Sequence, residues 1–155
     1  MESKSKDHVL IIVRGLPGSG KSTFVRNTYP DMLNVEIDKI HVKDGIYKFD
    51  KNDLFKGIDL CLKTTKDWVS AGCDVVVSNT FIKREHIEDY KKIADENNAR
   101  FIVFRMVSGD FKSIHNIPEH TMIKMTYEFE PYEGETFVIP SETGYEYQST
   151  TENIE

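Results

Sequence analysis

Val9-Leu10-Ile11-Ile12-Val13 leads through Arg14 into Gly15-Leu16-Pro17-Gly18-Ser19-Gly20-Lys21-Ser22-Thr23, and this stretch decides the fold. The five apolar residues form an uninterrupted β-favouring run, as in a strand buried on both faces. The spacing Gly15-x-x-x-x-Gly20-Lys21-Ser22 then matches a phosphate-binding loop between a strand and a helix. The alternative is a glycine-rich turn with a coincidental lysine. The strand expected before it and the helix expected after it favour the phosphate-binding loop.

Each residue type of this loop has a chemical reason to be there. Glycines let the backbone curl until several N–H groups point at phosphate oxygens, and the N-terminus of the following helix adds its dipole. Lys21 supplies a positive charge for the β- and γ-phosphates of ATP, and the Ser22 hydroxyl is the expected ligand of Mg²⁺. The candidate nucleotide-binding residues are Gly15, Pro17, Gly18, Ser19, Gly20, Lys21, Ser22 and Thr23.

Strand and helix patterns alternate outward from the loop. A short helix should follow the loop and stop before Pro30, because proline disfavours helix in the residue before it. Strands are expected over 33–37, 74–80 and 101–107, and helices over 53–71 and 84–97. A loop or short lid over 108–117, a helix from Pro118 to about Phe129 and a short strand over 136–139 should follow. This order predicts an α/β fold whose parallel sheet is covered by helices on both faces.

Length and charge suggest one domain with an acidic end. The chain has 155 residues, which suits a single domain, expected here over residues 1–140. Residues 1–124 carry 20 basic and 18 acidic side chains, a net charge of +2, whereas the rest contains eight Glu and no Lys or Arg. Residues 141–155 are therefore expected to be an acidic, disordered tail. A nearly neutral body is compatible with an anionic substrate.

Several other classes of protein are disfavoured. No run of about 18 apolar residues exists, so a membrane-spanning helix is not expected. The polar start MESKSKDH does not resemble a secretory leader. Cys61 and Cys73 are too few for a disulfide framework or a cysteine-based zinc site, and we expect a reducing, cytoplasmic location.

Polar residues follow two more of the expected strands, and parallel strands present their carboxyl ends at one sheet edge. Asp38 could be the base that accepts a proton from an attacking hydroxyl, or it could cap a helix. Ser78-Asn79-Thr80 stands where a Walker-B acid would be expected. Asn79 and Thr80 could hold substrate or metal-bound water, or they could cap the next helix.

The cations near the expected lid are the candidates for stabilising charge on a transferring phosphate. Lys112 lies in the loop and is the first choice. Arg105 lies within a strand and could equally be a surface charge. His115 and His120 lack a third ligand at a recognisable spacing and do not indicate a metal site.

The chain resembles the polynucleotide-kinase-like branch of P-loop kinases, which includes 5′-hydroxyl polynucleotide kinases and small AAA-type proteins of cellular and phage origin. The resemblance covers about residues 9–131. It rests on the loop described above, Ile37-Asp38, Val75 to Thr80, His115-Asn116-Ile117-Pro118 and Ile123-Lys124-Met125. The chain departs from that branch at Ser78-Asn79, where an acid is usual, and at Lys112, near the position of a lid arginine.

The resemblance implies an ATP- and Mg²⁺-dependent kinase with a P-loop NTPase fold and a mobile lid. Lys21 and Ser22 would hold phosphate and metal, and Asp38 would activate the acceptor hydroxyl. Lys112 would touch the transferring phosphate. The expected partners are ATP and a hydroxyl acceptor, foremost the 5′ end of a nucleic acid. A small-molecule kinase and an ATP-binding regulator with weak catalysis are the alternatives, and the sequence leaves the oligomeric state open.

Overall fold

The computed structural model describes residues 7–37, 42–43, 46–47, 51–107 and 126–149. Its centre is a six-stranded sheet with the order β2-β5-β1-β6-β7-β8. The strands are β1 (Val9–Arg14), β2 (Leu33–Glu36), β5 (Val75–Ser78), β6 (Arg100–Met106), β7 (Thr136–Ser141) and β8 (Gly144–Ser149). β3 (Val42–Lys43) and β4 (Ile46–Tyr47) form a separate two-stranded ribbon. The first five strands of the large sheet are parallel, and β8 alone is antiparallel to its neighbour.

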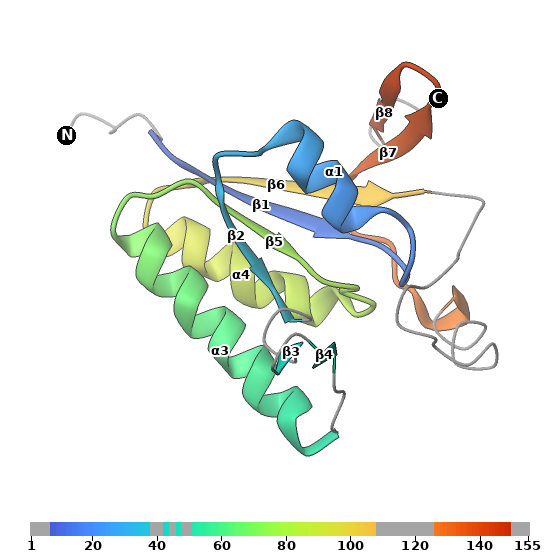
Figure 1. Ribbon diagram of the computed structural model, residues 1–155. Helices are drawn as coiled ribbons and strands as arrows, with labels where there is room; N and C mark the ends of the chain where they lie inside the picture. Colours follow the sequence, from blue (N-terminus) through green and yellow to red (C-terminus); the bar gives the residue numbers. More distant parts are fainter. Residues whose placement is uncertain (1–6, 38–41, 44–45, 48–50, 108–125, 150–155) are drawn as a thin grey trace.

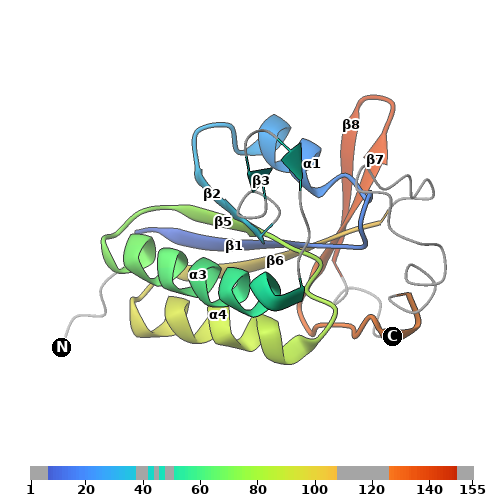
Figure 2. The same ribbon diagram turned by 60° about the horizontal axis from the view of Figure 1, so that its bottom comes forward.

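Helices cover both faces of this sheet (Figures 1 and 2). Helix α1 (Lys21–Thr28) lies on one face, whereas α3 (Lys51–Ser70) and α4 (Arg84–Glu96) lie side by side on the other. The predicted α/β fold with helices on both faces is therefore confirmed. Within the described residues, no helix is long and apolar enough to cross a membrane.

Alternating side chains of the strands build two separate cores. Leu10, Ile12, Val35 and Val77 belong to the cluster beneath α3 and α4. The strand neighbours that face the opposite way belong to the cluster beneath α1, among them Ile11, Val13, Val76, Met106 and Val138. β1 contributes to both clusters and is buried along its whole length. This two-sided burial explains its continuous apolar sequence.

The expectation of a disordered tail from residue 141 is wrong for the residues through Ser149. Those residues extend the predicted strand 136–139 to Ser141 and then return as β8. Tyr145 and Tyr147 alternate with polar residues, and the ring of Tyr145 packs edge-on against Phe24 at a centroid distance of 4.9 Å. Tyr145 and Tyr147 both contact the Phe24 ring of α1 from one face of the hairpin. The acidic composition of this segment hid the period-two pattern. Residues 150–155 lie outside the described residues.

The other predicted elements agree with the structure to within about two residues, the usual uncertainty of element ends. The predicted lid over 108–117 and most of the helix from Pro118 lie outside the described residues. Residues 126–128 are helical, and Phe129 follows them without belonging to a helix.

Candidate active site

The loop between β1 and α1 has a conformation that requires glycine. A Cβ atom on Gly15 would lie 2.5 Å from Ser19 Oγ and 3.1 Å from Met106 Cβ. Gly18 and Gly20 have φ angles of 78° and 93°, in the left-handed region that residues with a Cβ rarely adopt. The glycines of the motif thus serve close packing at Gly15 and backbone curvature at the other two positions.

Lys21 and the start of α1 make this loop a suitable anion site. Lys21 Nζ donates hydrogen bonds to the carbonyl oxygens of Gly15 and Leu16, both at 2.9 Å. The ammonium group therefore lies across the loop. Helix α1 begins directly after Gly20, its N-cap residue, which has no side chain to cap the first N–H groups. Uncapped N–H groups and the helix dipole both favour a bound phosphate.

The remaining predicted loop residues have different exposures. Pro17 and Ser19 are buried, whereas Ser22 and Thr23 are exposed at the first turn of α1. Ser19 Oγ is buried and has no hydrogen-bond partner among the described residues.

A buried acid lies beside the loop serine. Ser22 Oγ donates a hydrogen bond to Glu36 Oε1 at 3.1 Å, and Asn34 Nδ2 donates to the same oxygen at 3.2 Å. Glu36 ends β2 and is 8% exposed. Glu36 is not among the site residues expected from the sequence. The available signal was a carboxylate at the polar end of a half-buried strand, two residues before Asp38.

The end of β5 connects the loop to β2. Asn79 Oδ1 accepts a hydrogen bond from Ile37 N at 2.8 Å, and Asn79 N donates to Val13 O at 3.2 Å. Gly15 N donates to Thr80 O at 3.3 Å. Asn79 therefore fixes the backbone immediately before Asp38. Neither Asn79 nor Thr80 caps α4, whose N-cap is Lys83.

Two predicted catalytic residues, Asp38 and Lys112, lie outside the described residues, as do His115 and His120. Arg105 is described and lies on β6, where it pairs with Arg14 of β1. Its guanidinium lies 4.5 Å from the ring centroid of Phe129 and 5.5 Å from that of Phe137. It also pairs with Glu135 Oε2 at 3.5 Å. Arg105 thus belongs to a group of aromatic and acidic side chains beside β6.

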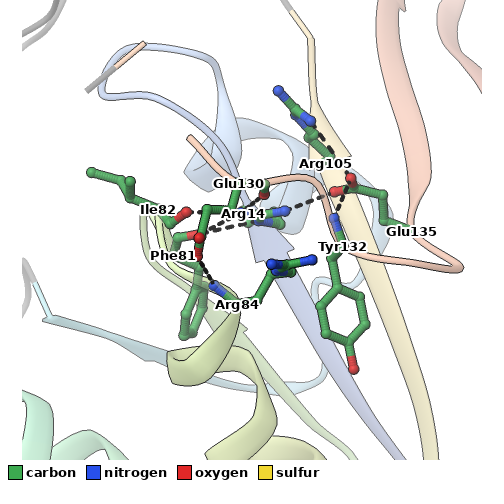
Figure 3. A network of polar contacts seen from close by, with 8 residues as sticks. All are labelled: Arg14, Phe81, Ile82, Arg84, Arg105, Glu130, Tyr132 and Glu135. Carbon is green, nitrogen blue, oxygen red and sulfur yellow. Dashed lines mark hydrogen bonds and ion pairs between the residues drawn. The ribbon is translucent and has the colours of Figure 1, made fainter. Parts of the chain in front are cut away.

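A buried polar network is centred on Arg14, the residue before Gly15 (Figure 3). Arg14 is completely buried, and its Nη1 donates to Glu135 Oε1 at 2.9 Å. Its other N–H groups donate to Phe81 O at 3.1 and 2.5 Å and to Glu130 O at 2.7 Å. Burial lowers the pKa of Arg14, and the charge of Glu135 opposes this shift. The side chain thereby joins the base of the loop to the β5–α4 connection and to residues 130–135.

Glu130 extends this network to the N-terminus of α4. Its Oε1 accepts a hydrogen bond from Arg84 N at 2.9 Å, and its own N–H donates to Ile82 O at 2.9 Å. The hydrogen bond from Arg84 N holds the pKa of the Glu130 carboxyl below its usual value. A distant carboxylate thus takes the place of a local helix cap.

The residues at the loop fit a magnesium ion. The Ser22 hydroxyl and the Glu36 carboxylate present oxygen donors, which are the ligands that Mg²⁺ prefers. Within the described part of the chain, no group of three or more His, Cys, Asp or Glu side chains could hold a metal ion alone. Mg²⁺ is usually held by one or two protein ligands together with substrate phosphates and waters, so these two donors would suffice.

The fold and the loop define a P-loop nucleotide-binding protein with the kinase fold. The model of the AAA domain family matches residues 10–117, and the chain belongs to this family.

Solved structures share this fold at low sequence identity. One chain of the Pnkp1/Rnl/Hen1 RNA repair complex matches with a TM-score of 0.66 and 16% identity, over 81% of this chain and 45% of that chain. A gluconokinase from Sinorhizobium meliloti 1021 matches with a TM-score of 0.57 and 18% identity, over 88% and 84%. Kti12 from Chaetomium thermophilum, solved in complex with ADP-AlF3, matches with a TM-score of 0.55 and 14% identity, over 79% and 80%. These similarities support a P-loop kinase fold and do not specify the acceptor.

Proposed function

We propose that the protein is an ATP-dependent kinase that transfers the γ-phosphate to a hydroxyl acceptor, the 5′-hydroxyl of a nucleic acid. The observation that carries the kinase assignment is the glycine loop with Lys21 across it at the uncapped start of α1. Family membership and the shared fold support the same assignment. The 5′-hydroxyl acceptor is supported by the polynucleotide-kinase-like motifs and by the fold shared with the RNA repair complex.

The residues have distinct roles in this reaction. Lys21 and the loop amides bind the phosphates, and Ser22 would hold Mg²⁺, which neutralises phosphate charge when it is bound. Asp38 takes the proton of the acceptor hydroxyl as that oxygen attacks the γ-phosphorus. The bond from the γ-phosphorus to the bridging oxygen breaks, and ADP leaves with that oxygen. Lys112 would stabilise the charge on the transferring phosphate.

Asn79, which the structure describes, supports the role assigned to Asp38. Its side chain holds the Ile37 N–H and so fixes the direction in which the chain enters Asp38. A general base needs a defined position, because small misplacements cost large factors in rate.

Phosphate transfer is tested with γ-labelled ATP and Mg²⁺ on DNA and RNA oligonucleotides with a 5′-hydroxyl. The same oligonucleotides with a 5′-phosphate are the matched control acceptors. Label on the 5′-hydroxyl oligonucleotides only, lost in Lys21→Ala, is the expected result. Label on members of a panel of nucleosides and sugars alone would assign a small-molecule acceptor. ATP binding without transfer to any acceptor would favour a regulator.

Asp38→Asn tests the base. We expect ATP binding close to that of the wild type and a turnover lower by about 10² or more, the usual loss when a general base is removed. Asp31→Asn is the control, because Asp31 is exposed and lies before β2. Wild-type turnover in Asp38→Asn would remove this residue from the mechanism.

A further inference from the structure

The strand beside β1 lacks the acid that phosphate-loop enzymes use for their metal. Such enzymes hold Mg²⁺ with the loop hydroxyl and with a carboxylate at the end of a neighbouring strand. Here that strand is β5, and it ends in Ser78 followed by Asn79. We propose that Glu36, at the end of β2, supplies the missing carboxylate. The metal-binding acid would thus lie on β2, one strand further from β1 than usual. This inference rests on the proposed function, because it concerns the Mg²⁺ that accompanies a bound nucleotide.

The strand register places Glu36 at the level where the acid is missing. Glu36 pairs with Ser78, and Ser78 pairs with Val13 two residues before Gly15. All three residues therefore lie in one row across the sheet, at the edge that carries the phosphate loop. In Figure 1, β2 and β5 run side by side toward this edge.

Glu36 also lies on the side of the sheet where the phosphate loop continues into α1. Val35 and Val77 pack in the core beneath α3 and α4, so the next residues, Glu36 and Ser78, face α1. Adjacent strands are about 4.8 Å apart, so an acid on β2 must reach further than one on β5. Glutamate is longer than aspartate by one carbon–carbon bond, about 1.5 Å. Its Oε1 lies 3.1 Å from Ser22 Oγ, the expected metal ligand.

The surroundings of Glu36 favour a bound cation. Glu36 is 8% exposed, and no Lys, Arg or His side chain pairs with it among the described residues. A largely buried carboxylate without a cationic partner is costly, and a divalent cation would offset that cost. The Asn34 amide donates to Glu36 Oε1 and orients it.

Ser78 gives an independent indication that a polar ligand binds beside this row of residues. Ser78 Oγ is buried and lacks a hydrogen-bond partner in the described part of the structure. Buried hydroxyl groups are normally satisfied, so an unpaired oxygen beside Glu36 points to a missing polar ligand. Hydrated Mg²⁺ fits, because this ion usually keeps several of its waters.

The test measures how strongly Mg²⁺ increases nucleotide affinity. The dissociation constant of a non-hydrolysable ATP analogue is measured by calorimetry in excess Mg²⁺ and in EDTA, for the wild type and for Glu36→Gln. Glutamine keeps the shape and one acceptor for Ser22 but removes the charge. We expect Glu36→Gln to bind no more weakly than the wild type in EDTA. The enhancement by Mg²⁺ should fall at least about tenfold, as when the support of a metal site is removed.

Two further variants complete the design. Adding Ser78→Asp to Glu36→Gln returns a carboxylate to β5 and should recover most of the lost enhancement. Glu142→Gln removes an exposed acid in the hairpin turn and should behave as the wild type. Lack of any recovery in the double variant would count against relocation of the acid.

The outcomes separate the inference from the proposed function. Full Mg²⁺ enhancement in Glu36→Gln would overturn the inference and leave the kinase assignment intact. Weak binding of Glu36→Gln in both media would assign Glu36 a structural role and also overturn the inference. A wild-type protein that binds no nucleotide in either medium would overturn the proposed function, and the inference with it.

Discussion

Glu135→Gln is expected to lower the free energy of unfolding by about 4 kcal/mol, within the range for breaking a buried ion pair on one side. Arg14 and Glu135 are 0% and 1% exposed, so water cannot replace the lost partner. Glu135 Oε1 accepts from Arg14 Nη1 and Oε2 accepts from Tyr132 N, both at 2.9 Å. An amide has only one acceptor oxygen. One of these two donors would then face an NH₂ group, and the Arg14 charge would be uncompensated.

The loss can be read from urea unfolding, followed by far-UV circular dichroism and by fluorescence of Trp68. With a slope of about 2 kcal/mol per molar urea, typical of a small protein, the midpoint should fall by about 2 M. Coincident transitions from both probes would support two-state analysis.

The matched control is Glu133→Gln, two residues away and exposed. It should change stability by no more than about 0.5 kcal/mol, as is usual for surface substitutions. A midpoint for Glu135→Gln within about 0.5 M of the wild type would refute the argument, because a shift that small is far below the range for a broken buried pair.

Three further results are expected. Glu130→Gln should flatten the acid side of the melting-temperature profile. The pKa of Glu130 is lowered from 4.5, so its stabilising effect is present above pH 4.5 and is lost as the pH falls through the lowered pKa. Equal profiles for variant and wild type would contradict this. Asn79→Ala should lower turnover with little change in the KM for ATP, whereas Asn79→Asp, which keeps an acceptor for Ile37 N, should retain more activity; equal rates would exclude the positioning role. Gly15→Ala should weaken ATP binding measured by calorimetry, because the added Cβ would lie 2.5 Å from Ser19 Oγ, and wild-type affinity would show that the loop can adjust.

The sheet and its helices could be predicted because their signals are local. β1, β5 and β6 contain nearly continuous apolar runs, and α3 and α4 carry apolar residues at helical spacing. β8 was missed because its pattern consists of two tyrosines among polar residues. The alternation can be interpreted as a strand only once both tyrosines are seen to contact Phe24.

The loop could be predicted for a similar reason, since its chemistry is contained in eight consecutive positions. The roles of Glu36 and Arg14 could not be predicted, because these roles depend on partners distant in the chain. Ser22 and Glu36 are 14 positions apart, and Arg14 and Glu135 are 121 apart. No spacing rule connects such pairs, and only the register of β2 with β5 or the return of the chain after β6 brings them together.

The Arg14 network connects the phosphate loop with the described residues that follow the range 108–125. Described residues on either side of this range are held to the sheet by hydrogen bonds. Val107 N donates to Val138 O at 2.9 Å on one side, and Glu130 O accepts from Arg14 on the other. Arg14 directly precedes Gly15. The same side chain that holds Glu130 therefore starts at the base of the phosphate loop. The hydrogen bonds of Arg14 thus tie the base of the phosphate loop to Glu130 and Glu135.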